Sequence, residues 1–209
     1  QGDWSSDVCS SDLFKQDLAG QYEAQRIGIE HVGLTNLEDV VKNKDSQRYY
    51  IQRPGTDGYA YYESGFDESV KIVVKPDSGS QTQHLNRKIF GKMDFSKTGR
   101  YLIFSSLASV ERKTAHSEVY RYDIEKKKLT RLQFKDGKYN KKSLRAKDPS
   151  YSPVDGGQRW IIMVRNFLNT DQLYLFDSYK GDGYVLTNAK EKTQFSSPRF
   201  SPDGSKIAV

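Results

Sequence analysis

The chain has 209 residues, of which 33 are basic and 27 acidic, so its formal net charge at pH 7 is +6. Hydrophobic residues make up 35% and aromatic residues 12%, enough for a packed core, and no apolar run is long enough for a transmembrane helix. The single cysteine, Cys9, excludes a disulfide framework within the chain and a thiolate metal site.

Residues 1–13 show no periodicity. The stretch DWSSDVCSSDL resembles the translation of a sequencing-library adapter, so we interpret residues 1–13 as an artefact and expect them to be disordered. A genuine polar N-terminal tail is the alternative. Cys9 and three aspartates lie in this stretch; without them, 33 basic residues stand against 24 acidic ones, a net charge of +9.

Residues 14–46 precede the repeats described below. QRIGIEHVGL is typical of a strand, and TNLEDVVKNK (residues 35–44) predicts a short helix with Thr35 or Asn36 as N-cap. The segment belongs either to an earlier domain or to the end of an earlier copy of the repeat.

A turn motif recurs in residues 92–106, 148–164 and 195–209, and in a degraded copy in residues 49–64. The copies in residues 148–164 and 195–209 have an aromatic residue, a serine, a turn rich in Pro, Asp and Gly, and an apolar strand, which predicts a hairpin. In residues 92–106, Lys97 and Thr98 take the places of the proline and the aspartate, and the degraded copy keeps Pro54, Asp57 and Gly58 before an aromatic strand. The serines are 56 and 49 residues apart. We assign a structural role in the turn to Phe95, Ser96, Gly99, Tyr151, Ser152, Pro153, Asp155, Gly156, Phe200, Ser201, Pro202, Asp203 and Gly204.

A second marker advances with the first. Strands end at Asp77, Asp123 and Asp177, and each is followed by a polar turn and a short closing strand. The unit is therefore four strands in roughly fifty residues, which is typical of β-propeller blades. The apolar runs RYLIF and RWIIMV indicate strands covered on both faces, as in a blade between two neighbours.

SPRFSPDGSKIAV, PSYSPVDGG and YRYDIEKKKLTRL resemble the WD-like repeat of TolB-like propeller proteins. The resemblance implies an all-β fold: a partial β-propeller of about three four-stranded antiparallel blades plus the start of a fourth. The expected blades are residues 47–88, 89–140, 145–192 and 195–209. Because the family has six or seven blades, we expect the gene to continue beyond Val209.

Other features favour structural interpretations. The basic runs at residues 125–132 and 135–147 are more typical of exposed loops than of a nucleic-acid site. His31, His84 and His116 lack metal-ligand spacing, and no nucleophile elbow or phosphate loop is present. The strand tyrosines fit packing between blades better than a glycan platform; they are Tyr59, Tyr61, Tyr62, Tyr101, Tyr120, Tyr122 and Tyr174.

The sequence thus predicts no catalytic residue, no metal and no cofactor. By resemblance, we expect a non-catalytic interaction module of the bacterial envelope or periplasm whose partner is another protein, with no nucleic acid bound. Two alternatives stay open: the substrate-filtering propeller of a prolyl-oligopeptidase-type or tricorn-type peptidase whose catalytic domain lies elsewhere, and a glycan-binding surface protein.

Overall fold

The structure is a computed structural model. It describes residues 48–64, 70–108, 116–135, 143–166 and 170–209 in full, and only the backbone of residues 13–16, 22–29, 34–42, 46–47, 109–110, 114–115 and 167. The expectation of disorder in residues 1–13 lies outside the described residues except for Leu13, which begins the first strand. The chain forms two compact units, Gln1–Gln52 with Gly58–Asn86 and Arg53–Asp57 with Arg87–Val209.

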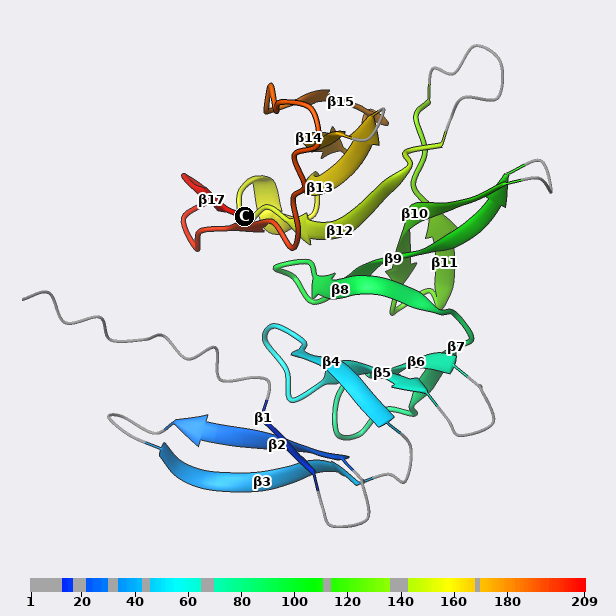
Figure 1. Cartoon of the computed structure of the whole chain (residues 1–209). Coiled ribbons are helices and arrows are strands. Elements are labelled where there is room, and N and C mark those ends of the chain that lie inside the picture. Colours follow the sequence, from blue (N-terminus) through cyan, green and yellow to red (C-terminus); the bar gives the residue numbers. More distant parts are fainter. Residues whose placement is uncertain are drawn as a thin grey trace, which may run out of the picture. The chain divides into compact units, whose positions relative to one another are not determined.

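The described secondary structure is antiparallel sheet in which consecutive strands pair, with one short 3₁₀ turn at Asp155–Gly157 (Figure 1). The first unit holds a three-stranded sheet, β1 (Leu13–Gln16), β2 (Tyr22–Ile29) and β3 (Leu34–Lys42), and a four-stranded sheet, β4 (Ser46–Gln52), β5 (Tyr59–Ser64), β6 (Val70–Lys75) and β7 (Gln83–Leu85).

The second unit holds two four-stranded sheets and one pair of strands. Their strands are β8 (Ile89–Phe95), β9 (Tyr101–Val110), β10 (Thr114–Asp123) and β11 (Lys128–Arg131); β12 (Ala146–Tyr151), β13 (Trp160–Phe167), β14 (Thr170–Asp177) and β15 (Asp182–Val185); and β16 (Arg199–Phe200) with β17 (Ile207–Ala208). Three four-stranded antiparallel sheets and the start of a fourth confirm the predicted fold class.

The predicted helix at residues 35–44 is wrong. Residues 34–42 form strand β3, which pairs with β2 in a register that places Leu37 opposite Ile27. The spacing of Leu34, Leu37 and Val41 imitates a helical face, but a helix this short is marginal in isolation, and pairing with β2 satisfies the backbone of the same residues. His31 and the chain around it lie outside the described residues.

The central strands of the third four-stranded sheet, β12–β15, are covered on both faces, as their apolar runs predict. Ile161, Ile162, Met163 and Val164 are consecutive and fully buried. Because successive strand residues point to opposite faces, complete burial of all four requires a neighbour on each side. Ile162 and Val164 face a cluster that includes Phe200 of the fourth copy.

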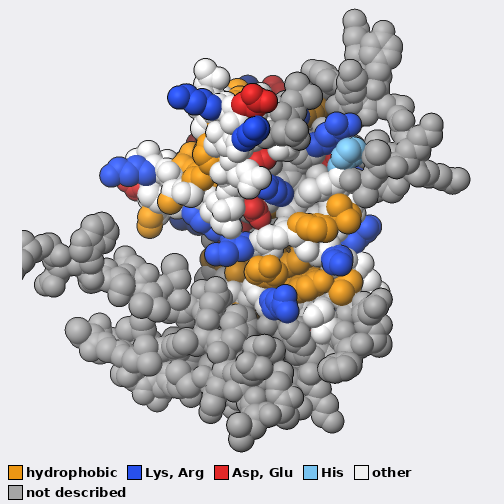
Figure 2. Space-filling view, in the orientation of Figure 1, with side chains coloured by type: hydrophobic (Ala, Val, Ile, Leu, Met, Phe, Trp, Pro, Cys, Tyr) orange, Lys and Arg blue, Asp and Glu red, His pale blue; other side chains and the backbone are white. Residues whose placement is uncertain are grey.

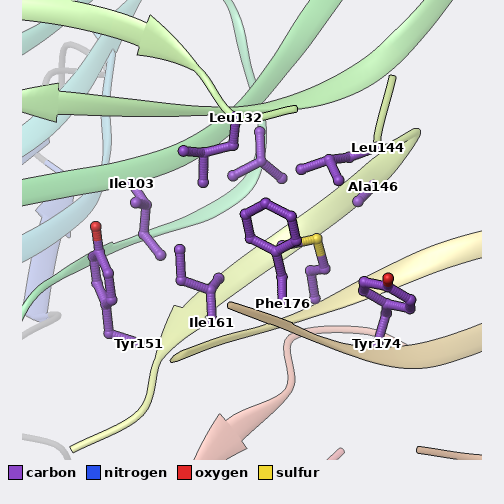
Figure 3. Close-up of a cluster of buried hydrophobic side chains, with 10 residues drawn as sticks. Ile103, Leu132, Leu144, Ala146, Tyr151, Ile161, Tyr174 and Phe176 are labelled. Carbon is purple, nitrogen blue, oxygen red and sulfur yellow. The ribbon is translucent and has the colours of Figure 1, made fainter. Parts of the chain in front are cut away.

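The opposite face of β13 contributes to the core shared by the second and third sheets (Figure 3). Phe176 lies at its centre with 1% of its surface exposed, and its ring meets that of Phe134 edge-on at 6.0 Å. Side chains from both sheets surround it; they are Ile103, Val119, Leu132, Leu144, Ala146, Tyr151, Ile161, Met163 and Tyr174. This core therefore joins the two sheets.

The first strand of each four-stranded sheet contains a bulge that the sequence did not reveal. The register shifts after Arg48 in β4, after Phe90 in β8 and after Lys147 in β12. A residue with positive φ follows each of these positions: Tyr49 (57°), Gly91 (73°) and Asp148 (50°). Such bulges bend a strand and re-aim the side chains that follow it.

The second and third bulges touch each other through Asp148. A β-carbon at Gly91 would lie 1.6 Å from Asp148 Oδ1, while Asp148 Oδ2 accepts a hydrogen bond of 3.2 Å from the backbone N–H of Ser197. Only glycine leaves room for this buried carboxylate at its present position.

Gly91→Ala is therefore expected to lower the free energy of unfolding by about 2–3 kcal/mol, because it adds steric displacement of Asp148 to the cost of positive φ. Gly156→Ala is the matched control: Gly156 has φ +75° but nothing within 4 Å of its β-carbon position, so about 1 kcal/mol is expected. Urea unfolding of both variants measures the difference. Equal losses would contradict the proposed contact.

Candidate functional site

The repeated serines hold their turns by the same hydrogen bonds. Ser96 donates its N–H to Tyr101 O (2.8 Å) and its Oγ accepts from Tyr101 N–H (3.0 Å). Ser201 makes the same two bonds with Lys206, each 2.9 Å. Gly99 and Gly204 donate back to the carbonyls of these serines, at 2.7 and 2.8 Å. Each serine therefore closes a hairpin.

The third-sheet copy of the turn is longer. Ser152 donates its N–H to Trp160 O (2.9 Å), but its Oγ accepts from Val154 N–H (3.3 Å). The glycine N–H that donates back within the turn is that of Gly157, to Val154 O, rather than that of Gly156. Trp160 is eight residues after Ser152, whereas the hydrogen-bonded partner is five residues after the serine in the other two copies, and the three extra residues accommodate the 3₁₀ turn at Asp155–Gly157.

The turn aspartates are bonded within their own turns. Asp155 Oδ2 accepts from the Trp160 indole N–H at 2.8 Å. Asp203 accepts from the Ser201 hydroxyl at 2.5 Å and from the Ser205 backbone at 3.0 Å. These hydrogen bonds from Ser201 and Ser205 lower the pKa of Asp203 to about 2. Both aspartates thus have partners that explain their place in the motif.

Successive turns lie against one another within the second unit. The Nε of Arg53 donates to Gly99 O at 2.7 Å, and Lys97 N–H donates to Gly157 O at 3.2 Å. A β-carbon at Gly204 would lie 2.7 Å from Val154, which places the fourth turn against the third. The turns therefore form one continuous surface.

Beside this surface, three residues from equivalent repeat positions meet. Asp94, Ser150 and Arg199 each directly precede the aromatic residue of their motif. Ser150 Oγ donates to Asp94 Oδ2 at 2.8 Å, and Tyr151 N–H donates to the same oxygen at 2.8 Å.

Arg199 completes the group. Its guanidinium donates to Pro149 O and to Met93 O, both at 3.3 Å, so it joins the first strands of the second and third sheets. Desolvation raises the pKa of Asp94, although the charge of Arg199 and the hydrogen bonds from Tyr151 and Ser150 act in the opposite direction.

These groups line a recess with a volume of about 240 Å³. Lys97 adds a second cation, and prolines and aromatic residues of the turns supply apolar surface. Of the predicted turn residues, the recess is lined by Phe95, Tyr151, Ser152, Pro153, Phe200, Ser201 and Pro202. Six others are not among its lining residues: Ser96, Gly99, Asp155, Gly156, Asp203 and Gly204.

Asp94, Ser150 and Arg199 were not among the residues predicted from the sequence. The signal was present as a constant offset, one residue before each aromatic, but their side chains have no chemical type in common. Such a position is recognised only when the copies are aligned and the strands are seen side by side.

The remaining candidates have structural surroundings. Five of the strand tyrosines are buried and two, Tyr59 and Tyr101, are half-buried, so none of the seven offers an open ring platform. The Lys126–Lys128 run lies exposed between Asp123 and Arg131, where a loop was expected. Residues 136–142 of the second basic run lie outside the described residues.

Solved structures with a similar fold decide what the repeats build. TolB from Acinetobacter baumannii matches with a TM-score of 0.64 at 20% sequence identity, over 90% of this chain and 42% of that one. A TolB protein from Agrobacterium tumefaciens matches with a TM-score of 0.63 at 18% identity, over 90% of this chain and 63% of that one. The fold is that of a TolB-like β-propeller.

The four-stranded sheets of this propeller are its blades, and the chain spans less than two thirds of the length of either TolB structure. A puromycin-hydrolysing peptidase from Mycobacterium tuberculosis matches with a TM-score of 0.53 at 13% identity, over 87% of this chain and 28% of that one. No family model and no curated protein sequence matches the chain. In the part of the chain that the structure describes, no helix is long and apolar enough to cross a membrane.

Proposed function

We propose that the chain is part of a non-catalytic propeller that binds another protein in the bacterial envelope. The observation that carries the proposal is the recess at the turn surface, where Asp94, Ser150 and Arg199 converge from three successive blades. The similarity to TolB structures supports a periplasmic setting by analogy.

The recess suits a polar protein segment. Lys97 and Arg199 supply cationic groups, Asp94 supplies a carboxyl group, and Pro153 and Pro202 supply rigid apolar surface. A partner that places an acidic or amide side chain here gains directed hydrogen bonds, while the surrounding turns exclude water from the contact. Complementary charge would also select the partner and speed its association.

The test compares two exposed lysines. The whole chain is immobilised and used to capture proteins from a bacterial envelope fraction, and the affinity of the captured protein is then measured for Lys97→Glu and Lys128→Glu. Lys97 lines the recess, whereas Lys128 lies at the start of β11. Lys97→Glu is expected to weaken binding about tenfold, about 1.4 kcal/mol, and Lys128→Glu less than about twofold. Equal effects would contradict this location of the binding site.

The second candidate function is substrate filtering for a peptidase. The similarity to the M. tuberculosis peptidase favours it, since that chain is much longer than the part matched here. Under this hypothesis the longer protein contains a hydrolase domain with a G-x-S-x-G nucleophile turn. Sequencing the complete gene separates the two hypotheses: presence of that domain favours filtering, and further propeller repeats without it favour protein binding.

A further inference from the structure

A second, larger pocket lies between the second and third blades, away from the recess proposed as the protein-binding site. Its volume of about 350 Å³ lies within the range of small-molecule sites. Polar side chains from four strands or their ends line it: His116 and Ser117 from β10, Arg145 and Lys147 at the start of β12, Asn166 from β13 and Asp171 from β14.

The polar groups of this pocket are held in place before any ligand binds. Asp171, whose side chain is 3% exposed, accepts from Asn166 Nδ2 at 2.8 Å and from Phe195 N–H at 3.2 Å, and forms an ion pair with Lys147 at 3.2 Å. Burial would raise the pKa of Asp171, but the bonds from Asn166, Lys147 and Phe195 hold it below its ordinary value. The carboxylate therefore stays ionised and keeps Lys147 and Asn166 oriented.

The two blades are also joined at this pocket. Ser117 Oγ donates to Ala146 O at 2.9 Å, and Leu144 is fixed by two bonds, one from its N–H to Glu118 Oε2 (3.1 Å) and one to its carbonyl from Arg165 Nε (2.7 Å). The residue between these two anchored neighbours is Arg145, which has φ +48°. Its surroundings hold it in a conformation that an arginine rarely adopts.

The charges of the pocket leave a cationic excess. Lys147 is matched by Asp171, whereas exposed Arg145 has no ion-pair partner among the described residues. His116 adds a group that can donate or accept a hydrogen bond. Figure 2 shows Lys and Arg side chains spread over the described part of one face of the chain, with fewer Asp and Glu. A ligand with negative charge is therefore the chemical complement.

We propose that this inter-blade pocket binds a small polar molecule that carries an oxyanion, a carboxylate or a phosphate, and is about the size of a monosaccharide. The guanidinium of Arg145 receives the oxyanion, because its planar array of N–H donors fits either group. His116, Ser117 and Asn166 face the hydroxyl groups of the ligand, and Val164 packs against its carbon skeleton.

The test uses two positive-φ positions. Glucose 6-phosphate, glucuronate and glucose are titrated by calorimetry against the whole chain and against Arg145→Gly and Lys127→Gly. Lys127 also has positive φ, at 50°, and is exposed in the β10–β11 turn outside the pocket. Glycine relieves backbone strain at both positions, so neither melting temperature is expected to fall. Arg145→Asn serves as a second variant, because asparagine tolerates this conformation.

At least one of the two charged sugars is expected to bind saturably, and whichever does so distinguishes a carboxylate from a phosphate ligand. Its affinity should fall at least about tenfold in both Arg145 variants and stay unchanged in Lys127→Gly. Three results would overturn the proposal: no binding of either charged sugar at about 10 mM, binding of glucose with equal affinity, or equal affinity in the Arg145 variants.

Discussion

Phe176→Ala is expected to lower the free energy of unfolding by about 4 kcal/mol, because it opens a cavity at the core that joins the second and third blades. Side chains of both blades bury Phe176. Its ring contacts the ring of Phe134, and Tyr174 belongs to the same cluster. The surrounding strands are held by their own backbone pairing, so they close such a cavity only in part.

Urea unfolding of the whole chain measures this loss. Tyr184→Ala is the control: Tyr184 makes an edge-on contact with Trp160 but is 53% exposed, so a loss of less than about 1 kcal/mol is expected. Phe176→Leu keeps most of the volume and should cost about 1.5 kcal/mol or less. If Phe176→Ala cost no more than Tyr184→Ala, the core between the two blades would not exist as described.

Asp177→Ala is expected to cost about 2–3 kcal/mol, because the carboxylate that ends β14 is fully buried and accepts four hydrogen bonds. Arg159 donates from Nε and a terminal nitrogen to Oδ2, at 3.0 and 2.8 Å, and the backbone N–H groups of Tyr179 and Lys180 donate to Oδ1, at 2.9 and 3.1 Å. Its loss leaves a guanidinium and two turn N–H groups without this acceptor.

The stability lost in Asp177→Ala is expected to depend on pH. Burial would raise the pKa of Asp177, but the hydrogen bonds from Arg159, Lys180 and Tyr179 outweigh it and hold the pKa below 3.8, its ordinary value. Because the folded-state pKa is the lower one, the ionised carboxylate stabilises the fold above about pH 4, and this stabilisation is lost as the pH falls through the folded-state pKa. The difference between the chain and Asp177→Ala should therefore shrink in acid.

Thermal melts of both proteins between about pH 3 and pH 7 measure this dependence. Asp203→Ala is the matched control, since Asp203 also accepts hydrogen bonds in a turn but is exposed, and a smaller loss is expected. A loss for Asp177→Ala that does not change with pH would show that the interaction is not that of an ionised carboxylate.

The sequence predicted the repeated features because their causes are local. A hairpin turn needs Gly, Asp or Pro at set positions, and a strand covered on both faces needs consecutive apolar residues, as at residues 161–164. The aspartates at the strand ends recur for the same reason: Asp123 bonds to Arg100 as Asp177 does to Arg159, each within one blade. Short-range requirements of this kind leave a recurring pattern along the chain.

Tertiary structure alone decided the rest. The strand at residues 34–42 replaced an expected helix because pairing with β2 outweighed a weak local preference. Asp94 and Arg199 are 105 residues apart in sequence, and they converge because successive blades place equivalent positions side by side. The inter-blade pocket has no sequence motif, since His116, Arg145 and Asp171 lie in or directly before different strands and meet only when two blades pack. The repeat therefore determined the blades, whereas their packing determined both candidate sites.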